Sequence, residues 1–305
     1  MSALLTMMLL AGPVDAGPQV AEFVRGGKVV RAARKIGDTR VAIAIADAPA
    51  EGMADHERDF EEAFVAFDKV VRQGDTSRDG SVASKLVAAA GGEPVNAPAD
   101  ACDLFRAVII AEKRAPGVYE PLIHLEDGGL RATLHELEVK ALPAPKDDAA
   151  CTVRLANPGA RLELGVLPFA VAIDRLVKTW RAKGYKDFTV DAGALKYFAG
   201  AVGDQPWKID LNGVGNKKVG QLQVENVALA MSFEPGHGAV IVETKSVAES
   251  FALGLVALGE GPGSGLKSLA AAGAKGVFVD TKGNVKHSPE LKAKISMVPA
   301  KDGGS

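Results

Sequence analysis

The sequence of 305 residues predicts an α+β fold with mixed sheets and helices, and two observations lead to this prediction. Segments with the twofold period of strands outnumber segments with the period of helices. Several strand-like segments follow one another directly, without the β-α-β alternation that a doubly wound parallel sheet requires. Apolar residues make up 47% of the chain and charged residues 24%, which is ordinary for a globular protein with a full core.

The N-terminal half begins with one strand and continues with helices. Residues 40–46 (RVAIAIA) alternate as a half-buried strand does. Residues 55–74 place phenylalanines and valines on one helical face, and the DTSRDG turn of residues 75–80 ends that helix. Two shorter helices are expected at residues 81–90 and 97–114.

The C-terminal half is richer in strands. Residues 134–142 and 151–164 alternate as strands, separated by a loop at 143–148, and a helix is expected over 166–182. The remaining expected elements are strands at 188–192, 207–211, 224–231, 239–244 and 276–280 and helices at 247–258 and 266–272.

The two ends of the chain are expected to lie outside the folded domain. Residues 1–35 are interpreted as a leader or poorly ordered segment, and residues 301–305 as a disordered tail. The apolar run at 3–12 resembles a truncated export signal but lacks a basic region before it, and it is too short to span a bilayer. If it is such a signal, the protein belongs in the periplasm or cell envelope; otherwise it is cytoplasmic. No transmembrane segment is expected.

Charge and cysteine content exclude several functions. A net charge of −2 and an aromatic content of 5% give no reason to expect nucleic-acid binding. Cys102 and Cys151 are too few for a zinc knuckle and too far apart for a redox motif. Their context favours two free or buried thiols, and a single disulfide in an exported protein is the alternative.

The segment LELGVLPFAVAIDR at residues 162–175 has the most informative local pattern. A strand-like run meets Gly165, and an amphipathic helix begins directly afterwards. The first amides of a helix have no partner within the helix, so a strand, a glycine turn and a helix N-terminus together favour an anion site.

Four further motifs accompany this segment in a fixed order: GVYEPL at 117–122, TVDAGALKYFAG at 189–200, QPWKIDL at 205–211 and SVAESFALGLVALG at 246–259. Together they resemble the FAD:protein FMN transferase (ApbE-like) family. That family reads roughly G-A-F-D-P-T, L-D-L-G-G-I-A-K-G-Y-A-V-D-R, G-G-D, P-W and A-D-A-L-A-T-A-L-x-x-L-G. The resemblance implies one domain over residues 36–300 with an ApbE-like, T-fold-related architecture and a cleft between subdomains.

The resemblance also implies a function. The family moves the FMN half of FAD onto a Ser or Thr of an acceptor protein, with release of AMP. Cleavage of the pyrophosphate needs a divalent cation to stabilise the leaving group, so FAD, Mg²⁺ and an acceptor flavoprotein domain are the implied ligands and partner. The alternatives are a catalytically degenerate member that binds flavin or a partner protein without transfer, and a scaffold without any nucleotide.

The site residues are carried over from the family motifs. The residues implied to bind the cofactor are Val118, Tyr119, Glu120, Glu163, Phe169 and Gly193. The implied metal ligands are the carboxylate of Glu249, which is also the best catalytic candidate, and the backbone carbonyl of Val166 or a neighbour. Each has a structural alternative: a half-buried turn for Tyr119, a surface strand position for Glu163, and a solvated or capping role for Glu249.

The departures from the family motifs favour the degenerate alternative. Phe169 stands where the family has Lys or, in some members, Glu, so a charge and its hydrogen bonds are lost at a position that would face phosphate. Val166 replaces a Gly, Leu253 replaces a Thr, and Gly193 opens a Gly-Ala-Leu sequence where the family has G-G-D.

Two further features lie near these motifs. Asp174 and Arg175 match the family's helix, but adjacent helical residues point in different directions, so helix structure explains them. His237 lies near the position of the family's H-I-I-D-P segment, and a loop histidine is the simpler reading of it.

Overall fold

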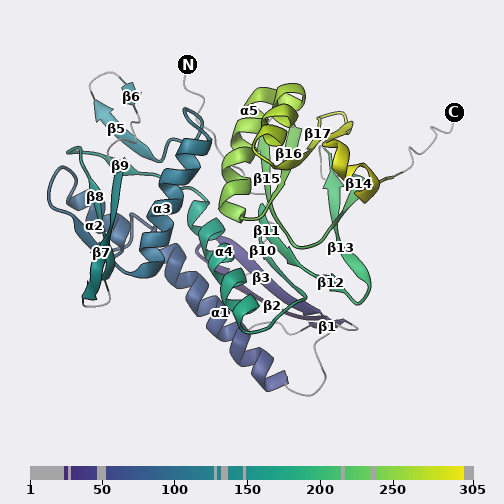
Figure 1. Ribbon diagram of the computed structural model, residues 1–305, viewed down its shortest axis with the longest axis horizontal. Helices are drawn as coiled ribbons and strands as arrows, with labels where there is room; N and C mark the ends of the chain where they lie inside the picture. The colour runs from purple at the N-terminus through teal and green to yellow at the C-terminus, as the bar shows by residue number, and fades with distance from the viewer. Residues whose placement is uncertain are drawn as a thin grey trace.

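The computed structural model describes residues 24–26, 29–46, 53–126, 129–131, 137–146, 149–213, 217–234 and 238–298. Its centre is a nine-stranded sheet in which every neighbouring pair is antiparallel (Figure 1). In spatial order its strands are β1 (Val24–Gly26), β2 (Val29–Ile36), β3 (Thr39–Ala46), β10 (Phe188–Ala192), β11 (Leu195–Ala199), β15 (Val227–Glu234), β16 (Gly238–Thr244), β17 (Lys275–Val279) and β18 (Val285–His287).

Helices cover one face of this sheet and form the main core with it (Figure 1). They are α1 (Met53–Gln73), α4 (Leu167–Ala182) and α5 (Val247–Ala271), with α3 (Ala99–Arg114) packed behind them. Trp180 of α4 is buried between Phe60 of α1 and Phe188 of β10, with ring centroids 5.8 and 5.2 Å away. Large apolar residues at helical spacing on α1 and α4 thus meet the alternating apolar residues of the sheet.

A four-stranded sheet packs on part of the opposite face. Its order is β12 (Ala201–Val202), β13 (Gln205–Asn212), β14 (Lys218–Val224) and β19 (Ile295–Met297), and the short helix η3 (Pro289–Lys294) precedes the last strand. Leu211 and Leu222 from this sheet join Leu229 and Val277 from the large sheet in a second core. The molecule therefore has a helical layer, a large sheet and a smaller sheet in succession.

The remaining elements lie on the side of α3 away from the large sheet (Figure 1). One three-stranded sheet has the order β4 (Val95–Ala97), β8 (Ala149–Leu155) and β7 (Leu137–Lys146), with α2 (Val82–Ala88) beside it. The other has the order β6 (Gly129–Arg131), β5 (Leu122–Glu126) and β9 (Arg161–Leu162).

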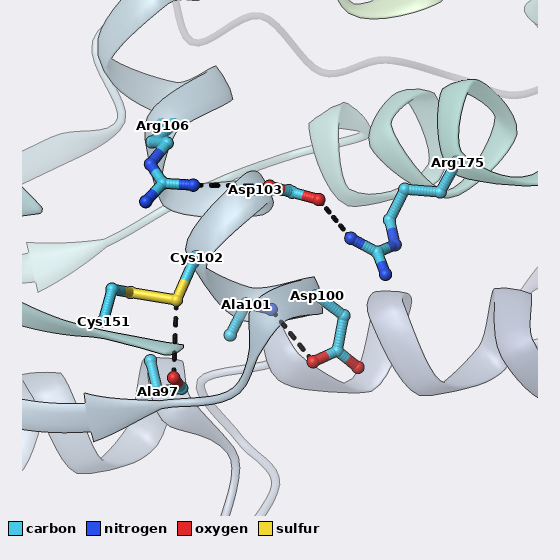
Figure 2. Close-up of a disulfide and its surroundings, with 8 residues drawn as sticks. All are labelled: Ala97, Asp100, Ala101, Cys102, Asp103, Arg106, Cys151 and Arg175. Carbon is cyan, nitrogen blue, oxygen red and sulfur yellow. Dashed lines mark hydrogen bonds and ion pairs between the residues drawn. A yellow bond between two sulfur atoms is a disulfide. The ribbon is translucent and has the colours of Figure 1, made fainter. Parts of the chain in front are cut away.

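Cys102 and Cys151 form a disulfide, so the expectation of two free thiols is wrong (Figure 2). Cys102 lies in the first turn of α3 and Cys151 on β8, with their Cα atoms 6.0 Å apart and both side chains buried. The bond joins the helical layer to the outer three-stranded sheet. The next residue, Asp103, forms ion pairs with Arg106 and, across to α4, with Arg175 (Figure 2).

The α+β fold class is confirmed, and several predicted boundaries are corrected. Seven of the eight residues of strand β2 lie in the segment 1–35, so this part of the expected leader is folded, and all eight pair with β3. Strand β11 was not predicted. The strand expected at 224–231 begins only at Val227, as β15, because β14 ends at Val224 and the chain bends at Asn226, which has a φ of 52°. Residues 1–23 and the tail at 301–305 lie outside the described residues.

Four more predicted segments differ in extent. The strand expected at 151–164 ends at Leu155 and resumes only as the short β9, and the loop expected at 143–148 is mostly the end of β7. The helices expected at 247–258 and 266–272 are two halves of α5, separated by a kink at Gly261.

No helix in the described part of the chain is both long and apolar enough to cross a membrane.

Candidate functional site

Three of the motif segments meet around Tyr119, in the loop that follows α3. The Tyr119 hydroxyl donates a hydrogen bond to the Leu164 carbonyl at 3.2 Å. Its ring lies edge-on to Phe251 of α5, with 5.6 Å between centroids and an interplanar angle of 84°. Nearby, the Glu163 amide donates to the Pro121 carbonyl at 2.8 Å. GVYEPL, LELGV and SVAESF, far apart in the sequence, therefore lie together.

The side chain of Tyr119 is buried in the core, whereas its two neighbours in the sequence are exposed to solvent. Only 6% of Tyr119 is exposed, and burial raises the pKa of its hydroxyl well above the usual range, so it stays a neutral donor. Its ring is covered by protein and does not offer a free stacking face. Val118 and Glu120 are exposed, and so is Glu163 across the loop.

Gly165 and Val166 form the turn into α4, as the sequence predicts. Gly165 has a φ of +56°, a conformation that glycine adopts easily. Val166 is the N-cap of α4, and its carbonyl accepts hydrogen bonds from the amides of Phe169 at 3.0 Å and Ala170 at 3.2 Å. A carbonyl oxygen has two lone pairs, so this one is already engaged within the helix.

Phe169 and Gly193 have structural contacts that account for them. Phe169 is half-buried, and its ring centroid lies 5.9 Å from that of Phe67 on α1. Its side chain therefore packs on the main core. Gly193 lies in the turn between β10 and β11 with a φ of +70°, and its amide donates to the Asp191 carboxylate at 2.9 Å.

Glu249 lies in the first turn of α5 and forms an ion pair with Arg114 at the end of α3, with Oε1 and Nη2 3.3 Å apart. The side chain of Glu249 is 30% exposed and that of Arg114 is 49% exposed. Both line a pocket of about 410 Å³ between α3, α4 and the start of α5. Arg175 and Lys178 of α4 also line it, and so do Asp103 and Asp174, so three basic and three acidic groups meet there.

Asp174 connects α4 to α5, a role that sequence reasoning missed. Its carboxylate accepts hydrogen bonds from the Ser246 hydroxyl at 2.7 Å and from the amides of Val247 at 2.7 Å and Ala248 at 3.2 Å. Burial raises the pKa of Asp174, the three hydrogen bonds oppose that shift, and the charge of Glu249 adds to it. The partners lie more than 70 residues away in sequence, and helical spacing carries no signal of such a contact.

In this structure the positions that the resemblance assigns to Mg²⁺ are engaged with other groups or lack a side-chain oxygen. Mg²⁺ prefers an octahedral set of oxygen ligands with carboxylates among them. Here the carboxylate of Glu249 is paired with Arg114, the carbonyl of Val166 is engaged within α4, and Leu253 is buried and has no side-chain oxygen. Within the described residues no three Asp, Glu, His or Cys side chains are grouped to hold a metal ion. His237 lies outside the described residues.

The likeness to solved structures covers nearly the whole of each relative at low identity. A flavin transferase ApbE from Vibrio cholerae is 15% identical with a TM-score of 0.70, and the match covers 87% of this chain and 99% of that one. The ApbE protein of Thermotoga maritima is also 15% identical, with a TM-score of 0.68, and the match covers 87% of this chain and 99% of that one. The flavinyl transferase ApbE of Pseudomonas stutzeri is 15% identical with a TM-score of 0.67, and the match covers 90% of this chain and 99% of that one. At this identity the likeness shows the fold. No curated protein matches the chain.

Comparison with family models shows the family of this chain, which the structural likeness alone does not show. A family model described as the ApbE family matches residues 38–234, which is more than half of the chain. The matched range contains the turn into α4 and the segment around Tyr119. The chain belongs to the ApbE family.

Proposed function

We propose that this protein is a homologue of the ApbE flavin transferases that binds FAD without transferring FMN. The observation that carries the proposal is the ion pair between Arg114 and Glu249. A guanidinium beside this carboxylate supplies the positive charge that a divalent cation would otherwise supply. The carbonyl of Val166 is engaged within α4 and Leu253 has a hydrocarbon side chain, so neither of these two positions offers a free oxygen to a cation.

Two observations support FAD as the ligand: the chain belongs to the ApbE family, and the segments that resemble the family's motifs lie together in the structure. The solved relatives are named flavin transferases, and the segments that resemble the family's motifs come together around Tyr119. The exposed residues Val118, Glu120 and Glu163 surround this point, and we propose them as the first contacts to test. Phe169 and Gly193, which are held by Phe67 and Asp191, are weaker candidates.

Mg²⁺-dependent transfer of FMN to a Ser or Thr of an acceptor protein is the second candidate. It is favoured by the partial exposure of the Arg114–Glu249 pair. Exposed ion pairs contribute only about 0 to 1 kcal/mol, so a bound cation can displace the guanidinium at small cost. Glu249 would then be the carboxylate that meets the cation.

Titration of FAD into the full chain, with Mg²⁺ or with EDTA, tests both candidates. If the protein binds FAD without transfer, we expect a heat of FAD binding that EDTA does not change. We also expect no AMP above blank when an acceptor domain with a target Thr is added. Release of AMP that requires Mg²⁺ would overturn the first candidate and support the second. Absence of FAD binding under both conditions would overturn both candidates and leave the scaffold without a nucleotide.

A matched pair of variants tests the role of the ion pair. Arg114→Ala frees Glu249, whereas Arg106→Ala on the same helix removes an exposed arginine that pairs with Asp103. If Arg114 excludes the cation, Arg114→Ala gains an effect of Mg²⁺ on FAD affinity and Arg106→Ala does not. If Mg²⁺ had the same effect on the FAD affinity of both variants, this role of Arg114 would be contradicted.

We also propose that the protein functions in an oxidising compartment such as the periplasm or cell envelope. Buried disulfides persist in such compartments and are rare in the cytoplasm of most organisms, and the Cys102–Cys151 bond supports this location. Thiol labelling of denatured protein isolated from its native cells without reductant tests the proposal. Two reactive thiols per chain would contradict it.

A further inference from the structure

The face of the large sheet that points away from the helices is only partly covered by the small sheet. Over β2, β3, β10 and β11 a groove of about 660 Å³ remains, and β13 borders it. We call this the β13 groove. Its floor contains small side chains, because Ala33 pairs with Ala42 and Ala44 pairs with Thr189, and paired residues point to the same face.

The β13 groove carries an excess of positive charge. Arg31, Arg40 and Lys208 line it with exposed side chains, and none of the three has an ion-pair partner within the described ranges. The two acidic residues of the lining are neutralised, since Asp191 pairs with Lys196 and Asp210 pairs with Lys218. An acidic ligand is therefore the complementary one.

The spacing of the two arginines favours an extended ligand. Arg31 lies opposite Ala44, and Arg40 lies four residues from Ala44 along β3. At about 3.3 Å per residue, the two arginine positions are about 13 Å apart along the strand direction. Two acidic side chains four residues apart on an extended polypeptide have the same spacing.

The strand that borders the groove has an edge available for pairing. Strand β12 pairs only with Gln205 and Pro206 of β13. From Trp207 to Asn212, β13 pairs with β14 alone within the part of the chain that the structure describes. An extended segment can add to such an edge through backbone hydrogen bonds.

We propose that the β13 groove binds an extended acidic segment of a partner protein, which adds as a strand beside β13 and places acidic side chains at Arg31 and Arg40. The backbone of the segment pairs with the edge of β13. Its side chains on one face lie over the alanine floor of the sheet. Neither the ion pair of Glu249 nor the surroundings of Tyr119 takes part in this surface.

Fluorescence anisotropy with the full chain tests the proposal. The probe is a labelled ten-residue peptide of Thr and Val with glutamates at positions 3 and 7, and the comparison peptide has lysines there. We expect the acidic peptide to bind at least tenfold more tightly than the lysine peptide, with affinity falling as salt increases. Tighter binding of polyphosphate or single-stranded DNA than of the acidic peptide would overturn the proposal.

Variants separate the groove from general electrostatic attraction. Arg31→Glu/Arg40→Glu is expected to weaken binding of the acidic peptide at least tenfold, and Lys267→Glu, an exposed position on α5, is the charge control. Ala42→Trp fills the floor without changing charge and is also expected to weaken binding at least fivefold. Circular dichroism confirms that each variant is folded.

Two results with these variants would overturn the proposal. Equal losses in Arg31→Glu/Arg40→Glu and Lys267→Glu would show unspecific attraction, and wild-type affinity in Ala42→Trp would show that the peptide does not enter the groove. Hydrogen exchange supplies an independent readout, because the proposal expects slower exchange of amides between Trp207 and Leu211 when the acidic peptide is bound. Unchanged exchange there under saturation would contradict strand addition.

Discussion

The carboxylate of Asp174 on α4 accepts a hydrogen bond from the backbone amide of Val247 on α5 at 2.7 Å. It also accepts one from the amide of Ala248, so a side chain of one helix satisfies the first free amides of another. The negative charge lies at the positive end of the α5 dipole. This contact ties the start of α5, where Ser246 is the N-cap residue and Glu249 lies in the first turn, to α4.

Replacing Asp174 by Ala is expected to destabilise the fold by about 2 to 3 kcal/mol, because a helix cap is lost and partly buried donors lose their acceptor. Urea unfolding followed by circular dichroism measures the change. Asp210→Ala removes an exposed carboxylate that pairs with Lys218 and is the control, with an expected effect within about 0.5 kcal/mol. Similar losses in both variants would contradict the capping role.

The raised pKa of Asp174 predicts a pH dependence with a definite sign. Because the folded state holds the proton more tightly than the unfolded state, the contribution of Asp174 to stability is greatest at low pH. It falls as pH rises from about 4 through the folded pKa. The difference in unfolding free energy between wild type and Asp174→Asn should therefore decrease with rising pH over this window. An increase would show that the pKa is lowered instead.

Loss of the disulfide is expected to cost about 4 kcal/mol, because the bond closes a loop with a sequence separation of 49 residues in the unfolded chain. The double variant Cys102→Ala/Cys151→Ala and reduced wild type should show similar losses in urea unfolding. Reductant should leave the stability of the double variant unchanged. Wild type that is equally stable with and without reductant would count against the bond.

Tyr119→Phe is expected to destabilise the protein by about 1 kcal/mol, since the carbonyl of Leu164 loses its donor while the ring keeps its contact with Phe251. Because the ring is covered by protein, FAD affinity should change by less than twofold. Val118→Ala, at a neighbouring exposed residue, is the control for stability. A large loss of FAD affinity in Tyr119→Phe would instead show that the hydroxyl contacts the ligand.

Local sequence patterns predicted the helices and the fold class, because apolar residues at helical spacing on α1 and α4 leave few alternatives. The boundary between β14 and β15, which belong to different sheets, was missed because Val224 and Val227 lie on either side of the short bend at Glu225 and Asn226. Strand β2 was missed because its apolar residues do not alternate strictly and its position is fixed by pairing with β3.

The sequence predicted which segments form the candidate site but did not predict which side chains contact one another there. Motif order indicated that the segments around Tyr119 and Gly165 belong together, and the structure brings them together. Whether Glu249 faces a cation or an arginine depends on Arg114, which lies outside every motif used in the prediction. A lone arginine at the end of an amphipathic helix gives no local signal of its partner.

The position of β10 between β3 and β11 has a consequence for biosynthesis. The hairpin of β2 and β3 leaves the ribosome more than 140 residues before its other neighbour, so one edge of β3 stays open while the intervening chain is made. Such distant pairing makes folding slow and exposes the nascent chain to aggregation. Chaperone contact with the segment before β10 would therefore be most valuable during synthesis, when neither the large sheet nor its helical cover can yet close.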